Sequence, residues 1–148
     1  MQTHISRLAE VAVAPLLHSA PEFAGRLERQ IAKGVGLTQF GVNHVTLEPG
    51  AMTSRRHWHA GEDEFVLVLS GSVTLIDENG AHELEPGAFA GFPAGEANGH
   101  HLVNRSGSRI ELLVVGTRKV GAERIHYPDA ADPGPFTIVR NERGERLP

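Results

Sequence analysis

The stretch GAMTSRRHWHAGEDEFVLVLSG, residues 50–71, sets two histidines one residue apart just before a strongly apolar run. If HWH is a strand, alternation sends His57 and His59 to one face and Trp58 to the other. Two imidazoles one pleat apart can share one ion, and a carboxylate beyond the turn at Gly61 can fold back to the same point. Such nitrogen and oxygen donors suit Fe, Mn, Ni, Cu or Zn. The alternative is a polar loop without an ion.

A second pair of histidines lies in GHHLVN, residues 99–104. On a short strand, His100 and Asn104 share one face and His101 lies on the other. An imidazole buried among apolar side chains without a polar partner is costly. A shared metal ion would supply that partner for both histidine pairs.

From about residue 37, short apolar runs alternate with turn signals. LTQFGVNHVTL ends at EPG (48–50), EFVLVLSG runs into SVTLI, and the DENG turn (77–80) precedes AHEL, AFAGFPAG, HHLVN and IELLVVG. Runs of this length and composition predict an all-β sandwich or barrel. No long stretch with a period of 3.6 residues supports a helical bundle.

The two histidine segments resemble the two sequence motifs of the cupin superfamily, in the right order. The first motif is matched by Gly50, His57, His59, Glu64 and Gly71. The second is matched by Gly87, Pro93, Gly95, His100 and Asn104. The resemblance covers roughly residues 40–116 and is most similar to small, single-domain, metal-binding cupins. It implies one antiparallel cupin-type β-barrel, also described as a double-stranded β-helix or jelly roll.

The resemblance also implies a set of metal ligands, namely His57, His59, Glu64 and His100. Counting forward from Gly95 would instead place Asn98 at the last position, because the loop before His100 is longer than the family's spacing. Counting back from Asn104 selects His100, and strand parity is more rigid than loop length. A β-bulge would exchange His100 for His101.

Other side chains near the motifs have two interpretations each. His44 lies on a strand that the resemblance places in the barrel wall, where it would line the pocket as an acid or base, or serve only as a wall residue. Glu62 and Asp63 are expected in a solvated turn. The rest of the pocket is expected to be apolar and to suit a substrate with an apolar body and a chelating end; its predicted lining is Val66, Val68, Phe92 and Leu102.

Three segments follow from this organisation. Residues 1–36 are expected to pack on the barrel or on a partner subunit, residues 37–116 to form the barrel, and residues 117–148 to form an extended arm with one short strand, FTIVR. The first segment is equally compatible with a helix and a strand. Residues 65–69 and 112–115 are apolar on both faces, so either the N-terminal segment or a second subunit should cover the outer face. We expect a homodimer, with Trp58 in the covered layer.

Composition excludes several classes of function. The net charge of −4 leaves no basic surface for nucleic acid. No run approaches the roughly 20 apolar residues of a membrane span, and the first residues make a poor signal peptide, so a cytoplasmic location is expected. The absence of cysteine restricts any metal to nitrogen and oxygen ligands.

The sequence therefore predicts a divalent transition metal, Fe, Mn, Zn or Ni, bound in a small barrel with a small-molecule ligand. Cupins of this kind suggest a metal-dependent enzyme, dioxygenase-like or isomerase-like, acting on a small oxygen-rich molecule. The alternatives are a non-catalytic module that binds or senses a small molecule, and a structural barrel without an essential metal. Residues 1–36 are too short and too poor in basic residues for a DNA-binding domain ahead of the barrel.

Overall fold

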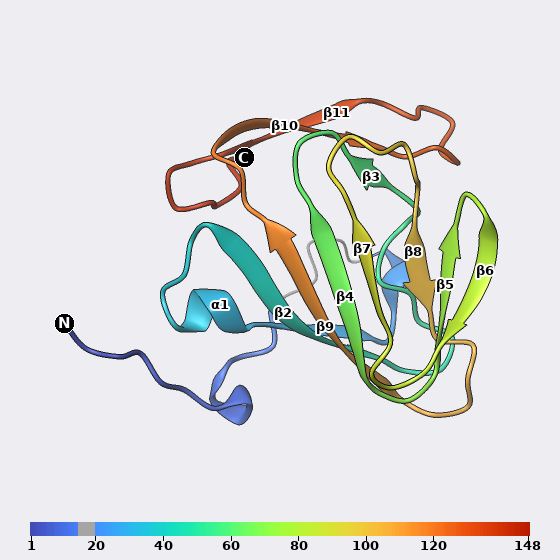
Figure 1. Cartoon of the computed structure of the whole chain (residues 1–148), viewed down its shortest axis with the longest axis horizontal. Helices are drawn as coiled ribbons and strands as arrows, with labels where there is room; N and C mark the ends of the chain where they lie inside the picture. Colours follow the sequence, from blue (N-terminus) through green and yellow to red (C-terminus); the bar gives the residue numbers. More distant parts are fainter. Residues whose placement is uncertain (15–19) are drawn as a thin grey trace.

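Antiparallel strands make up nearly all of the regular structure in the computed structural model, which describes residues 1–14 and 20–148 (Figure 1). The strands are β1 (Arg26–Gln30), β2 (Phe40–Leu47), β3 (Trp58–His59), β4 (Glu64–Ser70), β5 (Val73–Asp77), β6 (Gly80–Leu84), β7 (Phe89–Phe92), β8 (His101–Val103), β9 (Ile110–Thr117), β10 (Gly121–His126) and β11 (Phe136–Arg140). The helical elements are short: α1 (Ile31–Gly34) and two 3₁₀ turns, η1 (Leu8–Glu10) and η2 (Pro21–Phe23).

The strands form three antiparallel sheets. The largest has the order β1-β2-β9-β4-β7, and the other two have the orders β6-β5-β8 and β11-β10-β3. β2 and β9 pair along their whole length, from Phe40 opposite Thr117 to Leu47 opposite Ile110. This pairing joins segments far apart in the sequence, as a jelly roll requires. The predicted all-β, antiparallel architecture is confirmed.

The core lies between the five-stranded sheet and the β6-β5-β8 sheet. Alternate residues of β2, β4 and β9 point into it; the buried members include Val45, Leu47, Val66, Val68, Ile110 and Leu112. Leu75 and Leu102 close it from the opposite sheet. Because a fully buried Leu or Val contributes roughly 1.5–3 kcal/mol, this alternation fixes the register of the central strands.

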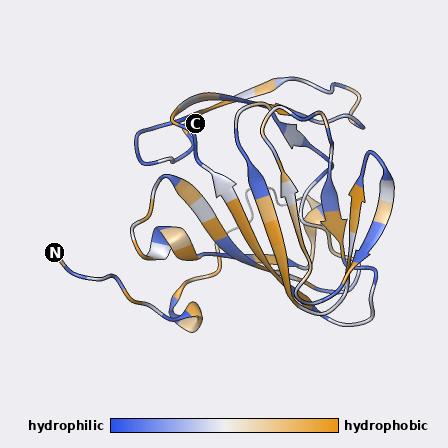
Figure 2. Ribbon diagram, viewed as in Figure 1, coloured by the Kyte–Doolittle hydropathy of each residue, from blue (hydrophilic) through white to orange (hydrophobic). Residues whose placement is uncertain are grey.

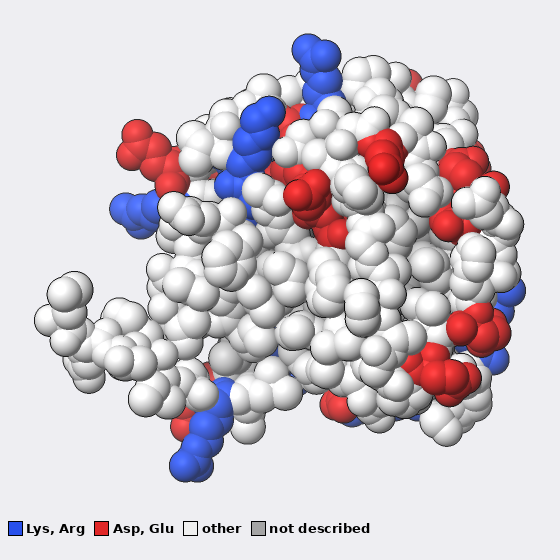
Figure 3. Space-filling model, in the orientation of Figure 1, with Lys and Arg blue, Asp and Glu red and all other residues white. Residues whose placement is uncertain are grey.

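The outer face of the five-stranded sheet is also apolar. Phe65, Leu67 and Leu113 lie on it and are only partly exposed, whereas Leu69 and Phe89 are exposed at 44% and 69%. Figure 2 shows the apolar colouring along β4 and β9. In Figure 3 the charged side chains gather around the margins of this view and leave the area over β9 and β4 largely uncharged.

The N-terminal segment contributes a strand at the edge of this sheet. β1 pairs with β2, with Arg26 opposite Leu47 and Gln30 opposite Asn43. A bridge between Val13 and Arg29 extends that edge. In the described part of this segment, the choice between helix and strand is thus resolved for residues 26–34 as a strand followed by the single turn of α1; residues 15–19 lie outside the described residues. The first ten residues run away from the barrel (Figure 1).

The C-terminal segment forms a hairpin across one end of the barrel (Figure 1). β10 pairs with β11 and also with β3, where Ile125 lies opposite His59 and His126 opposite Trp58. The sequence predicted only the second of its two strands, because GAERIH has no apolar run. No helix within residues 1–14 and 20–148 is long and apolar enough to cross a membrane.

Candidate metal centre

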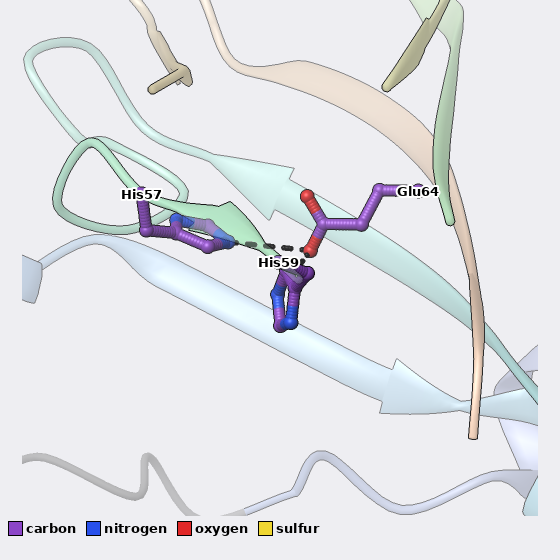
Figure 4. Close-up of side chains that lie close together, drawn as sticks. All are labelled: His57, His59 and Glu64. Atoms are coloured by element: carbon purple, nitrogen blue, oxygen red, sulfur yellow. Dashed lines mark hydrogen bonds and ion pairs between the residues drawn. The ribbon is translucent and has the colours of Figure 1, made fainter. Parts of the chain in front are cut away.

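Three side chains of the first motif converge on one point. His57 precedes β3, His59 ends it, and Glu64 begins β4 after a tight loop. The Nε2 atoms of His57 and His59 lie 3.2 and 2.9 Å from Oε1 of Glu64. The donor atoms of the three residues all lie within 4.8 Å of one another. Figure 4 shows both rings directed toward the carboxylate.

His100 approaches the same carboxylate from the second motif. Its Nε2 lies 2.5 Å from Oε2 of Glu64, and its ring stacks on Phe92 with centroids 3.5 Å apart. His101 points away, and its Nδ1 lies 2.8 Å from the carbonyl oxygen of Ser54. The structure therefore brings His100, and not His101, to the cluster.

Backbone carbonyls fix the rings of two of these histidines. Nδ1 of His57 lies 2.9 Å from the carbonyl oxygen of Arg55, and Nδ1 of His100 lies 2.8 Å from that of Asn98. A carbonyl accepts a hydrogen bond only, so each Nδ1 carries the hydrogen. In the neutral ring the lone pair is then on Nε2, the nitrogen that faces Glu64.

The carboxylate and the imidazoles shift each other's pKa. Burial alone would raise the pKa of Glu64, but hydrogen bonds from His100, His57 and His59 hold it well below its usual range. Burial alone would lower the pKa of His57, but the hydrogen bond and negative charge of Glu64 raise it above its usual value. Without a metal ion, a proton on His57 therefore helps to balance the negative charge of Glu64.

Two buried carboxylates lie behind His59. Nδ1 of His59 is 3.8 Å from Glu62 and 3.7 Å from Glu123. Arg140 donates to Glu62 through Nε at 2.8 Å and through Nη2 at 3.1 Å. The prediction that Glu62 lies in a solvated turn is wrong, because this side chain is only 3% exposed. The reason is the hairpin from the C-terminal segment, which covers the loop and supplies Arg140.

Asp63 follows the expectation for a turn. It is exposed, and its carboxylate accepts a hydrogen bond from the backbone N–H of Ala94 at 2.7 Å. Asn104 is fully buried and donates to the carbonyl oxygens of Leu47 and Ser108. Asn104 thereby anchors the end of β8 and fixes the parity that directs His100. The indole of Trp58, on the opposite face of β3 from His59, stacks on His126 of β10.

His44 is not brought to the cluster. It lies on the outer face of β2, with Nε2 3.5 Å from Glu111, while its neighbours Asn43 and Val45 face inward. Of its two interpretations, the structure therefore supports a wall residue and not one that lines the pocket. Side chains alternate along β2 as predicted, but the sequence does not indicate which face of the strand is internal. Both faces carry apolar residues, since Val42 and Val45 lie on opposite sides.

A cavity of about 670 Å³ opens beside the cluster, within the range typical of small-molecule sites. His57, His59 and Glu64 form part of its wall. Of the predicted apolar lining, Val66, Val68 and Leu102 belong to the packed core instead, whereas Phe92 lies beside the cluster and stacks on His100. The cavity wall combines apolar side chains, among them Val114, Ile125, Phe136 and Ile138, with polar ones that include Arg26, Glu28, Asn43, Glu62, Arg118, Tyr127 and Arg140.

The donors fit a divalent transition metal. Imidazole nitrogens with free lone pairs and one ionised carboxylate are the ligands such an ion prefers. All three Nε2 atoms face the carboxylate of Glu64, those of His57 and His59 toward Oε1 and that of His100 toward Oε2. The structure also shows residues that the sequence did not predict for the site, namely Glu123, Arg118 and Arg140. They come from segments far from both motifs, and no local pattern marks them.

Comparison with known proteins agrees with this geometry. The family model described as "Cupin domain" matches residues 43–116. A sugar phosphate isomerase of the cupin superfamily from Silicibacter pomeroyi is 36% identical; the match covers 92% of this chain and 86% of that chain, with a TM-score of 0.82. A provisionally assigned sugar phosphate isomerase from Acidithiobacillus ferrooxidans is 32% identical; the match covers 82% of this chain and 74% of that chain, with a TM-score of 0.70.

More distant structures share the fold alone. A polyketide cyclase from Streptomyces resistomycificus is 24% identical; the match covers 79% of this chain and 80% of that chain, with a TM-score of 0.62. No curated protein matches the sequence. The motifs, the antiparallel fold and these matches together show that the chain belongs to the cupin superfamily.

Proposed function

We propose that this protein is a metal-dependent isomerase of a phosphorylated sugar. The observation that carries the proposal is the convergence of three imidazole Nε2 atoms on the Glu64 carboxylate, beside a cavity whose wall includes His57, His59, Glu64 and several charged side chains. His57, His59, Glu64 and His100 would hold a divalent transition ion such as Fe, Mn, Zn or Ni. The ion would supply Lewis-acid polarisation of a substrate oxygen.

The character of the cavity supports a polyhydroxylated, charged substrate. Arginine, carboxylate and amide side chains form part of its wall, and these hydrogen-bond to hydroxyl and phosphate groups. The similarity to two structures described as sugar phosphate isomerases, at 36% and 32% identity, supports the same substrate class.

An isomerase also needs a side chain that moves a proton between neighbouring substrate atoms. His44 faces away from the cavity, but Tyr127 lines it, with its ring centroid 6.1 Å from that of His57. Tyrosine is among the side chains that serve as general acids and bases. Tyr127 takes that role in our proposal and leaves the ligands free to hold the ion.

The experiment begins with elemental analysis of protein purified without chelating resin. Metal-free protein is then loaded separately with Mn²⁺, Fe²⁺, Ni²⁺ and Zn²⁺ and incubated with aldose and ketose phosphates, with the products resolved by NMR. Interconversion that requires one of these ions is the expected result. Metal-loaded protein that binds a sugar phosphate but never converts it would instead indicate a non-catalytic binding module.

We also propose that a second copy of this chain covers the outer face of the five-stranded sheet. The exposed Leu69 and Phe89 extend the apolar side chains of Phe65, Leu67 and Leu113 into one surface, unusual for a monomer. Within the described part of residues 1–36, Val13 pairs at the sheet edge, and Leu69 and Phe89 stay exposed. The first ten residues, which run away from the barrel, would pack on the partner subunit.

A further inference from the structure

Five arginines line the cavity, and carboxylates neutralise three of them. Nη2 of Arg26 lies 3.0 Å from Glu28, Arg55 pairs with Glu22, and Arg140 pairs with Glu62. The other two are Arg118 and Arg146, of which Arg146 is exposed to solvent. Arg118 is half-buried, and its side chain has no hydrogen-bond or ion-pair partner anywhere in residues 1–14 and 20–148.

The surroundings of Arg118 make its charge costly. Burial lowers the pKa of this guanidinium, and the positive charge of Arg140 lowers it further; Glu28 and Glu62 act in the opposite sense without pairing directly. Arginine nevertheless stays protonated at neutral pH. A partly buried cation without a counter-ion is unfavourable, and an anion from solution would relieve the cost.

A glycine creates the place that this guanidinium occupies. Arg118 follows β9, and its backbone N–H donates to the carbonyl oxygen of Gln39 at 3.0 Å. A Cβ on Gly41 would lie 2.9 Å from both Nε and Nη2 of Arg118. Gly41 shares the inward face of β2 with Asn43 and Val45, so the guanidinium lies over the cavity face of the sheet.

The aliphatic part of the Arg118 side chain is packed on its other side. A Cβ on Gly144 would lie 2.9 Å from Cβ of Arg118 and 3.2 Å from its Cδ, so the turn after β11 packs against the aliphatic stem. Gly41 also pairs with Gly116 of β9, and neither residue places a side chain in the cavity beside the guanidinium. The stem is thus packed while the charged end faces open space.

We propose that Arg118 binds the phosphate group of the substrate, at the part of the cavity formed by Gly41 and Gly116. This inference rests on the proposed function and specifies how its substrate is recognised. A guanidinium presents several N–H donors in a plane that matches phosphate oxygens, and the resulting charge-assisted hydrogen bonds are stronger than neutral ones. The sugar oxygens would then bind at the metal centre formed by His57, His59, Glu64 and His100.

The test is calorimetric titration of metal-free and Zn²⁺-loaded protein with glucose 6-phosphate, glucose and gluconate. Arg118→Gln should weaken glucose 6-phosphate binding about 10–100-fold, the usual effect of losing a hydrogen bond to a charged group, and should leave glucose binding unchanged. Arg124→Gln is the matched control, because it removes the same charge from an exposed position outside the cavity. This control should bind all three compounds as the wild type does.

A second variant keeps the positive charge of Arg118 but displaces its guanidinium. Gly41→Ala places a methyl group where the guanidinium lies, so it should weaken glucose 6-phosphate binding several-fold without altering metal content. Its backbone conformation is ordinary for an L-residue, so it should fold normally. Arg118→Lys should retain part of the affinity, since a point charge replaces the planar fork.

The outcomes separate this inference from the proposed function. Equal loss of affinity in Arg118→Gln and Arg124→Gln, or no wild-type preference for glucose 6-phosphate over glucose, would overturn the phosphate site. Equal dependence of gluconate binding on Arg118 would indicate a general anion site rather than a phosphate site and would overturn the assignment. Because binding is measured without turnover, a protein that binds phosphate through Arg118 but isomerises no sugar refutes only the proposed function.

Discussion

His57 and His100 are direct partners in an isolated antiparallel bridge, with N–H to carbonyl hydrogen bonds of 3.2 and 3.0 Å in the two directions. The bridge joins the two sequence motifs backbone to backbone. It therefore sets the separation of two candidate ligands independently of any ion. Rigid placement of this kind lowers the cost of assembling a metal shell.

The two adjacent histidines of the second motif should differ sharply in their effect on metal binding. His100→Ala removes a candidate ligand and should lower metal affinity by more than the roughly 10–100-fold typical of supporting residues. His101→Ala should leave affinity unchanged, because its Nδ1 faces the carbonyl of Ser54. Competition with a chromophoric chelator measures both. Release of the metal by His101→Ala alone would refute the assignment.

The metal-free protein should owe a pH-dependent part of its stability to Glu64. The folded pKa of Glu64 is lowered from 4.5, so its contribution is complete above pH 4.5 and is lost as the pH falls through the folded value. The folded pKa of His57 is raised from 6.5, so its contribution is complete below pH 6.5 and is lost as the pH rises through the folded value. The Tm difference between wild type and Glu64→Gln should therefore be greatest between pH 4.5 and pH 6.5.

This pH profile should change when the ion is bound. Metal ions compete with protons for the imidazoles, so affinity should increase as the pH rises through the histidine range. Scanning calorimetry of both variants with and without Zn²⁺, from pH 4 to pH 8, provides the measurement. A Tm difference that is independent of pH in the metal-free protein would contradict the proton balance described for the cluster.

The ion pair between Glu62 and Arg140 should stabilise the hairpin over the site. Arg140→Met leaves the buried Glu62 without its counter-ion, which typically costs about 3–5 kcal/mol. Glu48→Gln is the control, since the Arg109 and Glu48 side chains are exposed and such pairs contribute about 0–1 kcal/mol. Urea denaturation measures both variants. Equal losses would show that the buried pair has no special role.

Tyr127 should affect turnover without affecting the metal. If it moves a proton, Tyr127→Phe should lower kcat about 10²–10⁴-fold and leave metal content and KM nearly unchanged. His44→Ala should leave turnover per folded molecule intact, because His44 lies on the outer face of β2. Steady-state kinetics with the active metal form tests both. The reverse pattern would assign the acid–base role to His44 instead.

The sequence predicts features that depend on neighbouring residues better than features that depend on contacts between distant segments. The strands and the convergence of His57, His59 and Glu64 follow from local alternation and motif spacing. The orientation of His44 could not be predicted, because apolar residues occupy both faces of β2. The burial of Glu62 and the positions of Glu123 and Arg118 depend on the polar C-terminal segment, whose contact with the site is decided by tertiary packing.

The apolar outer face should bring two chains together. Light scattering at micromolar concentration should give about twice the chain mass of 16.0 kDa. Replacing Leu69 and Phe89 by Glu should yield monomers, because charge would be buried without a partner. Leu147→Glu changes a comparably exposed leucine elsewhere and should remain dimeric. A wild-type monomer would contradict the proposal.

The metal centre itself is tested most directly by X-ray absorption spectroscopy of the protein loaded with one equivalent of Zn²⁺. The account predicts three imidazole nitrogens and a carboxylate oxygen at about 2.0–2.2 Å, the usual lengths for such ligands. It also predicts one imidazole fewer in His59→Ala. A shell dominated by water, or one with the same number of imidazoles in His59→Ala, would contradict it.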